Sequence, residues 1–465
     1  MVSRALTLAT LFAAVQLAGC SVFRSYDSEL QETNQQLAAG NVDAALALLE
    51  SHNKGEQKDL LYYFEKGELL RSKGDLQGSQ AAWRSADSVV LQWEDTVKLD
   101  TAKYLSQFGS YLVNDKVRRY EGYDYEKVML TTQMALNLLA QNDFDGARTE
   151  IKKTHEREAV IAELRDKEYL KREQDAEQQG IKTEYKDLQG YPVASLDAPE
   201  VVSLKNSYQS AFSHYLSGFV YEALGEKGLA APGYRKAAEL RPNTALLDQA
   251  LLDLDKNAAK PGESDVLVVV QSGLAPARDS IRIPLPLPLP IDNQLVIVPL
   301  SFPIIREDTS TAALGEIRLD DKVLALTSLN STSAMSRRAL RDDMPGIILR
   351  TSVRGISRGV AQHNLNKANP MAGLVVGLAS AVVEGADTRT WRTLPDQTQV
   401  ARLRLAPGEH QLSLPSNLGG TPVKVKIDRP YQVVSLRVIG NRVFAGGPAV
   451  EVAPQAPAQA IATLK

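Results

Sequence analysis

The chain has 465 residues, more than one hydrophobic core ordinarily organises, so we expect two or three domains. Hydrophobic residues make up 44% of it and charged residues 23%, proportions that are typical of a globular protein. The formal net charge of −3 gives no electrostatic basis for binding nucleic acid, so no nucleic-acid partner is expected.

The N-terminus has the features of a targeting segment. Arg4 provides a positive charge, and the apolar run that follows it is too short to span a bilayer. Residues 17–20 read Leu-Ala-Gly-Cys, which resembles the lipobox of bacterial lipoproteins, and Cys20 is the only cysteine of the chain. We expect a signal peptide over residues 1–19, an acylated Cys20 and a lipidated tether over residues 20–26. The alternative is an ordinary signal peptide with an incidental cysteine, or a buried free thiol.

A helical domain is expected over residues 27–256, because signals of the tetratricopeptide repeat recur in it. The clearest unit spans residues 207–242. It carries small, aromatic and proline residues where such a repeat packs and ends, namely Gly218, Tyr221, Gly225, Ala230, Tyr234, Ala237 and Pro242. Matching turns begin at Gly40 and Gly74, which lie one period of 34 residues apart. Related turns follow at Asn142 and at Gly225.

A charged helical insertion is expected near residues 154–188. This stretch is dense in Glu, Lys, Arg and Gln, and its thin apolar stripe predicts a long, mostly solvated helix with i,i+4 ion pairs. An extension that reaches toward a partner is the alternative. Residues 191–199 are predicted to form a surface loop. Residues 257–264 are predicted to be a linker, because the composition changes there.

The next part of the chain, residues 265–446, predicts a β-rich domain with a helical segment near residues 334–386. Residues 265–271 form a continuous apolar strand. Residues 281–290 carry proline at every second position, so this piece can pair on at most one side, as an edge strand or as polyproline II. The apolar run 371–383 is interpreted as a buried helix packed through its GxxxG face, with re-entrant contact with the bilayer as the alternative.

The last strands, which we place at residues 399–405, 411–414, 423–427 and 432–438, are typical of a small β-sandwich. Residues 447–465 are rich in Ala and Pro and are predicted to be disordered. The predicted fold class is therefore α+β and multidomain. A tetratricopeptide-like helical superhelix comes first, and a mostly β half with a helical insertion follows.

No pattern in the sequence gives a strong signal for catalysis. Residues 355–359 match the GxSxG of hydrolase nucleophile elbows, but Ser357 stands in a stretch with helical periodicity and is expected to be a helix-surface serine. The five histidines have no spacing that suits a metal site, and no glycine-rich phosphate loop is present. We expect no enzyme activity, no cofactor and no metal.

Two clusters of aromatic and charged residues are candidate partner-binding sites. Tyr120, Tyr123 and Tyr125 lie within six residues, just before a predicted helix. They either pack at the helix entry or offer a partner rigid contact area at a low entropic cost. Trp391 lies between two arginines, and its segment is interpreted chiefly as the structural join between the apolar run 371–383 and the final β module.

Together these features resemble a family of bacterial outer-membrane lipoproteins that contain tetratricopeptide repeats. The resemblance depends on Cys20, on the repeats and on four further segments, which are residues 120–126, 135–139, 272–276 and 386–395. Members of the family tend to be encoded beside other small envelope lipoproteins. These include proteins similar to the curli-secretion lipoprotein or to penicillin-binding-protein activators. The resemblance carries over no functional residue other than the lipidated Cys20.

We therefore expect a non-enzymatic scaffold at the periplasmic face of the outer membrane. Acyl chains on Cys20 would anchor it, and Ser21, where inner-membrane lipoproteins often have Asp, favours the outer membrane. Its helical repeats would bind a protein partner of the envelope, for example another lipoprotein. No small-molecule substrate is expected. The alternative is an envelope glycan-binding or glycan-assembly factor that acts through the β-rich half. A hydrolase that uses Ser357 is the third hypothesis.

Overall fold

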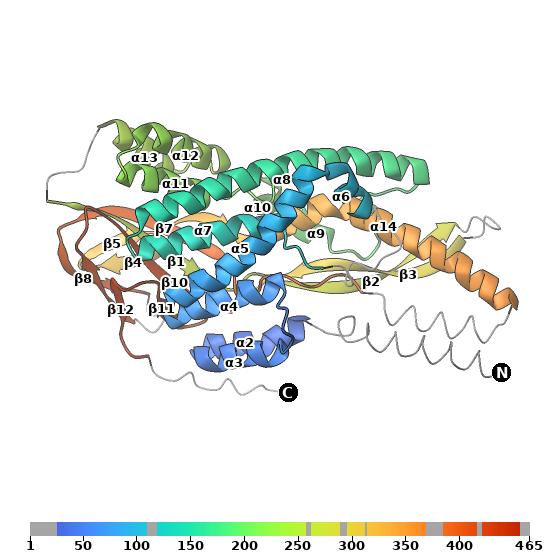
Figure 1. Ribbon diagram of the computed structural model, residues 1–465, viewed down its shortest axis with the longest axis horizontal. Helices are drawn as coiled ribbons and strands as arrows, with labels where there is room; N and C mark the ends of the chain where they lie inside the picture. The colour runs from blue at the N-terminus through green and yellow to red at the C-terminus, as the bar shows by residue number, and fades with distance from the viewer. Residues whose placement is uncertain are drawn as a thin grey trace.

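The computed structural model describes residues 26–108, 119–256, 262–288, 295–311, 314–368, 385–415 and 421–455. The predicted signal peptide, Cys20 and the apolar run 371–383 lie outside the described residues. Within them, a helical N-terminal half is followed by a strand-rich C-terminal half (Figure 1).

Helices make up the first half. In chain order they are α2 (Tyr26–Ala39), α3 (Val42–His52), α4 (Leu60–Lys73), α5 (Leu76–Leu99), α6 (Thr101–Phe108), α7 (Asp124–Ala140), α8 (Phe144–Gln179), the 3-10 helix η2 (Tyr185–Asp187), α9 (Val193–Leu196), α10 (Pro199–Val202), α11 (Ala211–Ala223), α12 (Lys227–Leu240) and α13 (Ala245–Lys256). Successive helices pack as hairpins, α2 with α3, α4 with α5, α7 with α8 and α11 with α12.

The turns within these hairpins repeat one geometry. Their first residues have positive φ angles of 89°, 87°, 60° and 76°, at Gly40, Gly74, Asn142 and Gly225. Glycine adopts this left-handed conformation without a steric penalty, and asparagine tolerates it. In two of the turns the next residue caps the following helix. The carboxylates of Asp75 and Asp143 accept hydrogen bonds of 2.8 Å from the amides of Gly78 and Gly146. The repeated turns predicted from the sequence are confirmed.

Glycines let the paired helices approach closely. Gly67 on α4 faces Trp83 on α5, and a Cβ atom added to Gly67 would lie 2.1 Å from the indole Nε1. Gly218 on α11 faces Tyr234 on α12, where an added Cβ atom would lie 2.4 Å from the ring. Both rings are fully buried. The glycines and aromatic rings therefore make the interhelical contacts that the repeat pattern predicts.

The second half consists of strands and one long helix. These are β1 (Ser264–Ser272), β2 (Ala277–Pro288), β3 (Leu295–Arg306), β4 (Glu316–Leu319), β5 (Lys322–Ala325), β6 (Thr327–Ser331), α14 (Thr332–Ala368), β7 (Gln397–Leu405), β8 (Gly408–Ser413), β9 (Pro422–Ile427), β10 (Tyr431–Ile439), β11 (Arg442–Ala445) and β12 (Val450–Val452). One sheet has the order β11-β10-β1-β7-β6, a second has the order β12-β9-β8-β4-β5, and β2 pairs with β3. In the first sheet β1 runs parallel to β10 and antiparallel to β7.

Strand β1 lies in the middle of three layers. Val266, Val268 and Val270 share a hydrophobic core with residues of the second sheet. Leu267 and Val269 point the other way and pack with α7, α11 and α12. Because successive side chains of a strand point to opposite faces, a strand covered on both sides is apolar throughout. Figure 1 shows the sheets at one end of an elongated molecule, with α8, α14 and the β2–β3 ribbon extending toward the other end.

The β2–β3 ribbon confirms the prediction that the proline-rich strand pairs on one side. Pro284 and Pro286 are exposed, and proline has no amide hydrogen to offer a further strand. Ile283 points inward and shares a core with Met344 of α14. The ribbon and α14 thus form a unit beside the two larger sheets.

Two of the predicted segments need correction. The charged helix α8 starts at Phe144, ten residues before the predicted insertion, and one face of its first half is buried, at Arg157 and Ile161. The predicted i,i+4 ion pairs are present farther along, between Glu163 and Lys167 and between Glu168 and Arg172. The helix predicted near residues 334–386 is α14, which is described as far as Ala368; residues 369–384 of the prediction lie outside the described residues. The predicted disordered tail is wrong at its start, because Val450–Val452 pairs with β9 as strand β12.

A buried ionic network joins the helices to the first sheet. Nε of Arg437 on β10 lies 2.9 Å from Oε1 of Glu68 on α4. Arg71, one turn along α4, donates hydrogen bonds to Gln271 on β1 (2.6 Å) and to Ser435 on β10 (2.9 Å). All five side chains are buried. Buried charges are costly without partners, so this network holds the two halves in one relative position.

The segment that precedes β7 forms a second junction. Trp391 is fully buried and stacks on Phe64 of α4, with ring centroids 4.5 Å apart. Its amide donates a hydrogen bond of 2.7 Å to Glu126 on α7. The amide of Thr393 donates one of 3.0 Å to Glu65 on α4. Trp391 is thus a structural join, between the helical half and the strand that follows it.

Replacing Glu68 with methionine should destabilise the protein by about 3–5 kcal/mol, because Arg437 and Arg71 then stay buried without a carboxylate. Glu163→Met is the matched control on α8, where the ion pair with Lys167 is largely exposed, and it should leave the stability almost unchanged. Denaturant unfolding followed by circular dichroism measures both. Equal costs for the two substitutions would contradict the structural role of the network.

The Glu65 carboxyl predicts how the second junction responds to pH. Burial raises the pKa of Glu65 to about 7, although hydrogen bonds from Thr393 and Arg392 oppose the shift. The folded protein therefore favours the protonated carboxyl. The stability that this group contributes is fully present below its unfolded pKa of 4.5 and is lost as the pH rises through 7.

Glu65→Gln removes this titration. The destabilisation that the substitution causes, measured by denaturant unfolding, should be smaller at pH 8 than at pH 5 by on the order of 2 kcal/mol. The reason is that only the wild-type protein carries a buried carboxylate at the higher pH. A destabilisation that stays constant between these pH values would show that Glu65 does not titrate as inferred.

Candidate functional site

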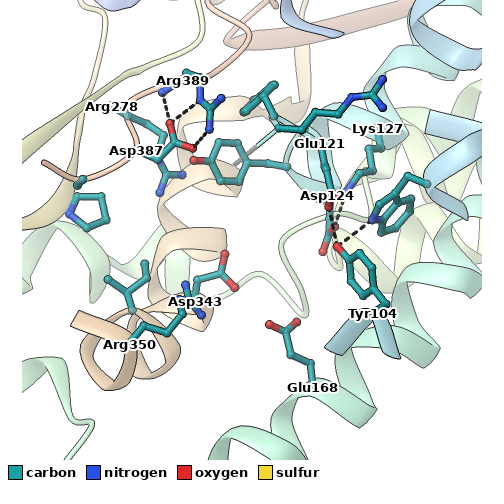
Figure 2. A pocket seen from close by; sticks show the side chains of 18 of the residues that line it. Tyr104, Glu121, Asp124, Lys127, Glu168, Arg278, Asp343, Arg350, Asp387 and Arg389 are labelled. Atoms are coloured by element: carbon teal, nitrogen blue, oxygen red, sulfur yellow. Dashed lines mark hydrogen bonds and ion pairs between the residues drawn. The ribbon is translucent and has the colours of Figure 1, made fainter. Parts of the chain in front are cut away.

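A cavity of about 550 Å³ lies between the two halves, within the size range of ligand-binding pockets. Its first wall comes from α5, α6, α7, α8 and the segment Arg119–Tyr123. Its second wall comes from β2, β3, α14 and residues 385–389. Figure 2 shows the side chains around an open centre, with Arg278 and Asp387 on one side and Tyr104 and Lys127 on the other.

Two of the predicted partner-binding tyrosines line this cavity. Gly122, with a φ angle of 76°, turns the chain between Tyr120 and Tyr123, whose rings meet edge to face with centroids 6.0 Å apart. Glu126 accepts hydrogen bonds from the Tyr120 hydroxyl and, at 2.8 Å, from the Tyr123 amide. These bonds fix the aromatic wall to the first turn of α7.

The other two predicted partner-binding residues do not reach the surface. Tyr125 is 1% exposed, and its hydroxyl lies 3.2 Å from the hydroxyl of Thr390. Trp391 is 0% exposed, at the junction described above. Both rings are interior contacts, so an external partner could not touch them in this structure. Partner binding stays a prediction for Tyr120 and Tyr123.

The cavity has an excess of positive charge. Among the described residues that line it, nine are basic and five are acidic, a formal excess of four positive charges within the lining. The basic residues are Arg119, Lys127, Arg165, Arg172, Arg278, Arg350, Arg354, Arg358 and Arg389. The acidic residues are Glu121, Asp124, Glu168, Asp343 and Asp387.

Three of the acidic residues share one arginine. Arg165 lies 2.6 Å from Asp124, 2.8 Å from Asp343 and 2.9 Å from Glu168. Burial opposes ionisation of Asp124, but the charges of Arg165 and Lys127 outweigh it, so the pKa of Asp124 is lowered. This cluster joins α7, α8 and α14 and keeps the cavity walls at a fixed separation.

The other two acidic residues are also engaged. Asp387 forms an ion pair of 2.8 Å with Arg389. Glu121 accepts a hydrogen bond of 2.7 Å from the hydroxyl of Tyr104. Each acidic side chain named for the cavity therefore has a partner inside the protein.

Arg278, on β2, is placed differently. It is 3% exposed, and its guanidinium carbon lies 4.1 Å from the centre of the Tyr123 ring, a cation–π distance. Within the described part of the chain, its Nε and Nη1 donate no hydrogen bond. Burial lowers the pKa of the Arg278 guanidinium, but nearby tyrosine and aspartate side chains raise it more, so the group stays charged.

The sequence interpretation missed the arginines of the cavity. Arg350, Arg354 and Arg358 are spaced four residues apart, and such positions share one face of a helix, so this stripe was a readable signal. Arg278 stands at the start of a strand without a motif around it. Only the structure shows that Arg278 is buried beside Tyr123 in the cavity wall.

The catalytic and metal hypotheses gain no geometric support. Ser357 lies inside α14, where its hydroxyl donates a hydrogen bond of 2.9 Å to the carbonyl of Val353, whereas a nucleophile elbow requires a strand-to-helix turn. Among the described residues there is no group of three or more His, Cys, Asp or Glu side chains that could hold a metal ion. None of the helices in the described ranges has the length and apolar character to cross a membrane.

Comparison with solved structures gives a weak likeness. No family model matches the chain, and no curated protein matches it by sequence. A solved structure of a tetratricopeptide repeat protein from Parabacteroides merdae is similar to it at 14% sequence identity. The alignment covers 50% of this chain and 99% of that one, with a TM-score of 0.14. That value is too low to support an argument about the fold.

Proposed function

We propose that this chain is a non-enzymatic binding protein of the bacterial cell envelope. Acyl chains on Cys20 hold it at the periplasmic face of the outer membrane. The lipobox-like residues 17–20 support the anchor, and Ser21 supports the outer membrane. Each buried methylene of an acyl chain contributes about 0.8 kcal/mol, so a stable anchor takes more than one chain.

The helical half supports a scaffold of the tetratricopeptide type. Its recurring left-handed turns and its glycine–aromatic contacts are features by which such repeats stack their helices. Stacked repeats build a concave surface on which partners bind. In this chain, however, Arg71 on α4 and Gln133 on α7 both hydrogen-bond with Gln271 of β1. This inner face is filled by the protein's own sheet, so we place partner binding elsewhere.

The cavity between the halves is the observation that carries the proposal. It is lined by Tyr120, Tyr123 and an excess of basic side chains, and tyrosine and arginine are enriched among the residues that dominate binding energy at interfaces. Its walls are held by the Arg165 cluster, which makes it pre-organised. We propose that a protein of the envelope, for example another lipoprotein, inserts a group into this cavity.

The alternative function, glycan binding through the β-rich half, loses part of its motivation. A protein that binds glycan through an aromatic contact needs an exposed ring, and Trp391, the candidate ring of this half, is fully buried against Phe64 of α4 and Trp83 of α5. We therefore keep one candidate function.

In-cell crosslinking of the full-length acylated protein, followed by affinity capture and mass spectrometry, tests the proposal. Arg119→Glu reverses the charge of an exposed residue that lines the cavity, and it should lower the yield of the partner at least tenfold. Arg84→Glu makes the same change on the exposed face of α5 and should leave the yield unchanged. Cys20→Ala should abolish capture by removing the anchor.

Two outcomes would refute the proposal. One is the absence of a recurrent envelope partner when the anchored protein is abundant and folded. The other is a partner recovered equally well with wild type and Arg119→Glu, because that partner would not use the cavity.

A further inference from the structure

The chemistry of the cavity is most specific at Arg278. A guanidinium presents five N–H donors in a planar fork. In Arg278 the donors at Nε and Nη1 are buried, and no described residue accepts a hydrogen bond from them. Unpaired buried donors cost free energy, so an acceptor brought by a ligand would be stabilised at this position.

A second buried arginine shows what the same fold does when it satisfies a guanidinium itself. Arg157 on α8 is 0% exposed. It donates hydrogen bonds to Glu94 (2.5 Å), Asp87 (2.7 Å) and the carbonyl of Lys127 (2.8 Å). The interior can therefore surround an arginine with acceptors, and Arg278 lacks such an arrangement at two of its nitrogens.

The two acids that act electrostatically on Arg278 form ion pairs with other residues. Asp343 and Asp387 favour its charged form electrostatically. Asp343, however, lies 2.8 Å from Arg165, and Asp387 lies 2.8 Å from Arg389. The cavity lining keeps its excess of four positive charges, and a recess lined with one sign of charge concentrates ions of the opposite sign.

We infer that the cavity binds an anionic group, a carboxylate or a phosphate, through the donor edge of Arg278. The Tyr123 ring packs against the guanidinium at 4.1 Å and holds it in the cavity wall. Planar guanidinium forks match carboxylate and phosphate oxygens. Arg350 and Arg354 of α14 line the same cavity and add positive charge. The inference rests on the proposed function, since it names the chemistry of the inserted group.

Two pairs of small probes test the inference and distinguish a carboxylate ligand from a phosphate ligand. The first pair is N-acetyl-aspartate amide and N-acetyl-asparagine amide, and the second is N-acetyl-phosphoserine amide and N-acetyl-serine amide. Calorimetric titration of the full-length protein in detergent should give at least tenfold tighter binding for one or both anionic probes than for the neutral counterpart. The pair that discriminates shows whether the site prefers a carboxylate or a phosphate. The preference should weaken with added salt.

Arg278→Gln should remove the preference for the anionic probe. The matched control is Arg306→Gln, on the same ribbon but outside the cavity lining, where an exposed ion pair with Asp279 is lost. It should keep the preference. Arg278→Lys retains the charge without the fork, so it should bind the anionic probe more weakly than wild type and still prefer it. The wild-type comparison stays decisive even if Arg278→Gln fails to fold.

Failure of this inference differs from failure of the proposed function. Equal binding of the charged and neutral probes by wild type, or no binding of either, would overturn the inference, as would an unchanged preference in folded Arg278→Gln. If an envelope partner is nonetheless captured in a manner sensitive to Arg119→Glu, the proposed function stands and only the chemistry at Arg278 is wrong. Anion preference without a captured partner would refute the protein partner and support the anion site.

Discussion

Buried carboxylates on one face of α4 are the constraint on which the rest of the structure depends. Glu68 meets Arg437 of β10, and Glu65 accepts hydrogen bonds from the backbone of the segment that leads into β7. Either contact, if separated, would leave ionised or polar groups in an interior that cannot solvate them. Helices and sheet therefore form one body, in contrast to two modules joined by a linker. Hydrophobic packing stabilises the contact between helices and sheet, and these polar contacts fix their relative position.

The position of the sheet determines which surfaces of the helical half stay exposed. Stacked helical hairpins usually leave their concave side open to a partner. Here one side of the helices receives the first sheet, with Leu267 and Val269 of β1 packed against α7, α11 and α12. The cavity lies instead between α5–α8 with residues 119–123 on one side and β2, β3, α14 and residues 385–389 on the other. Figure 1 shows α8, α14 and the β2–β3 ribbon extending beyond the two larger sheets. The cavity thus follows from how the two halves are joined, and neither half forms it alone.

Local features of the sequence were predictable, and long-range ones were not. The turns at Gly40, Gly74, Asn142 and Gly225 depend on residues that favour a left-handed backbone, and the proline-rich strand depends on missing amide donors, so both could be recognised from a few adjacent positions. Glu65 and Glu68 look like ordinary helix-surface residues in the sequence. Their burial depends on partners more than 300 positions away, such as Thr393 and Arg437. The cavity is a further example. Its tyrosines are close together in the sequence and could be recognised as a cluster, whereas Arg278, which lies beside them in the structure, is distant in the sequence.

The rigid junction also explains how an incompletely satisfied arginine can persist beside the cavity. A flexible wall would relax until Asp343 or Asp387 reached Arg278, which would cancel the charge and close the space. That movement is opposed because Arg165 holds Asp343 together with Asp124 and Glu168, across three helices. Binding sites are accurate when a supporting layer of contacts restrains the residues that meet the ligand. The same contacts hold Asp343 away from Arg278, so the fold retains a buried guanidinium with two nitrogens that donate no hydrogen bond within the described residues.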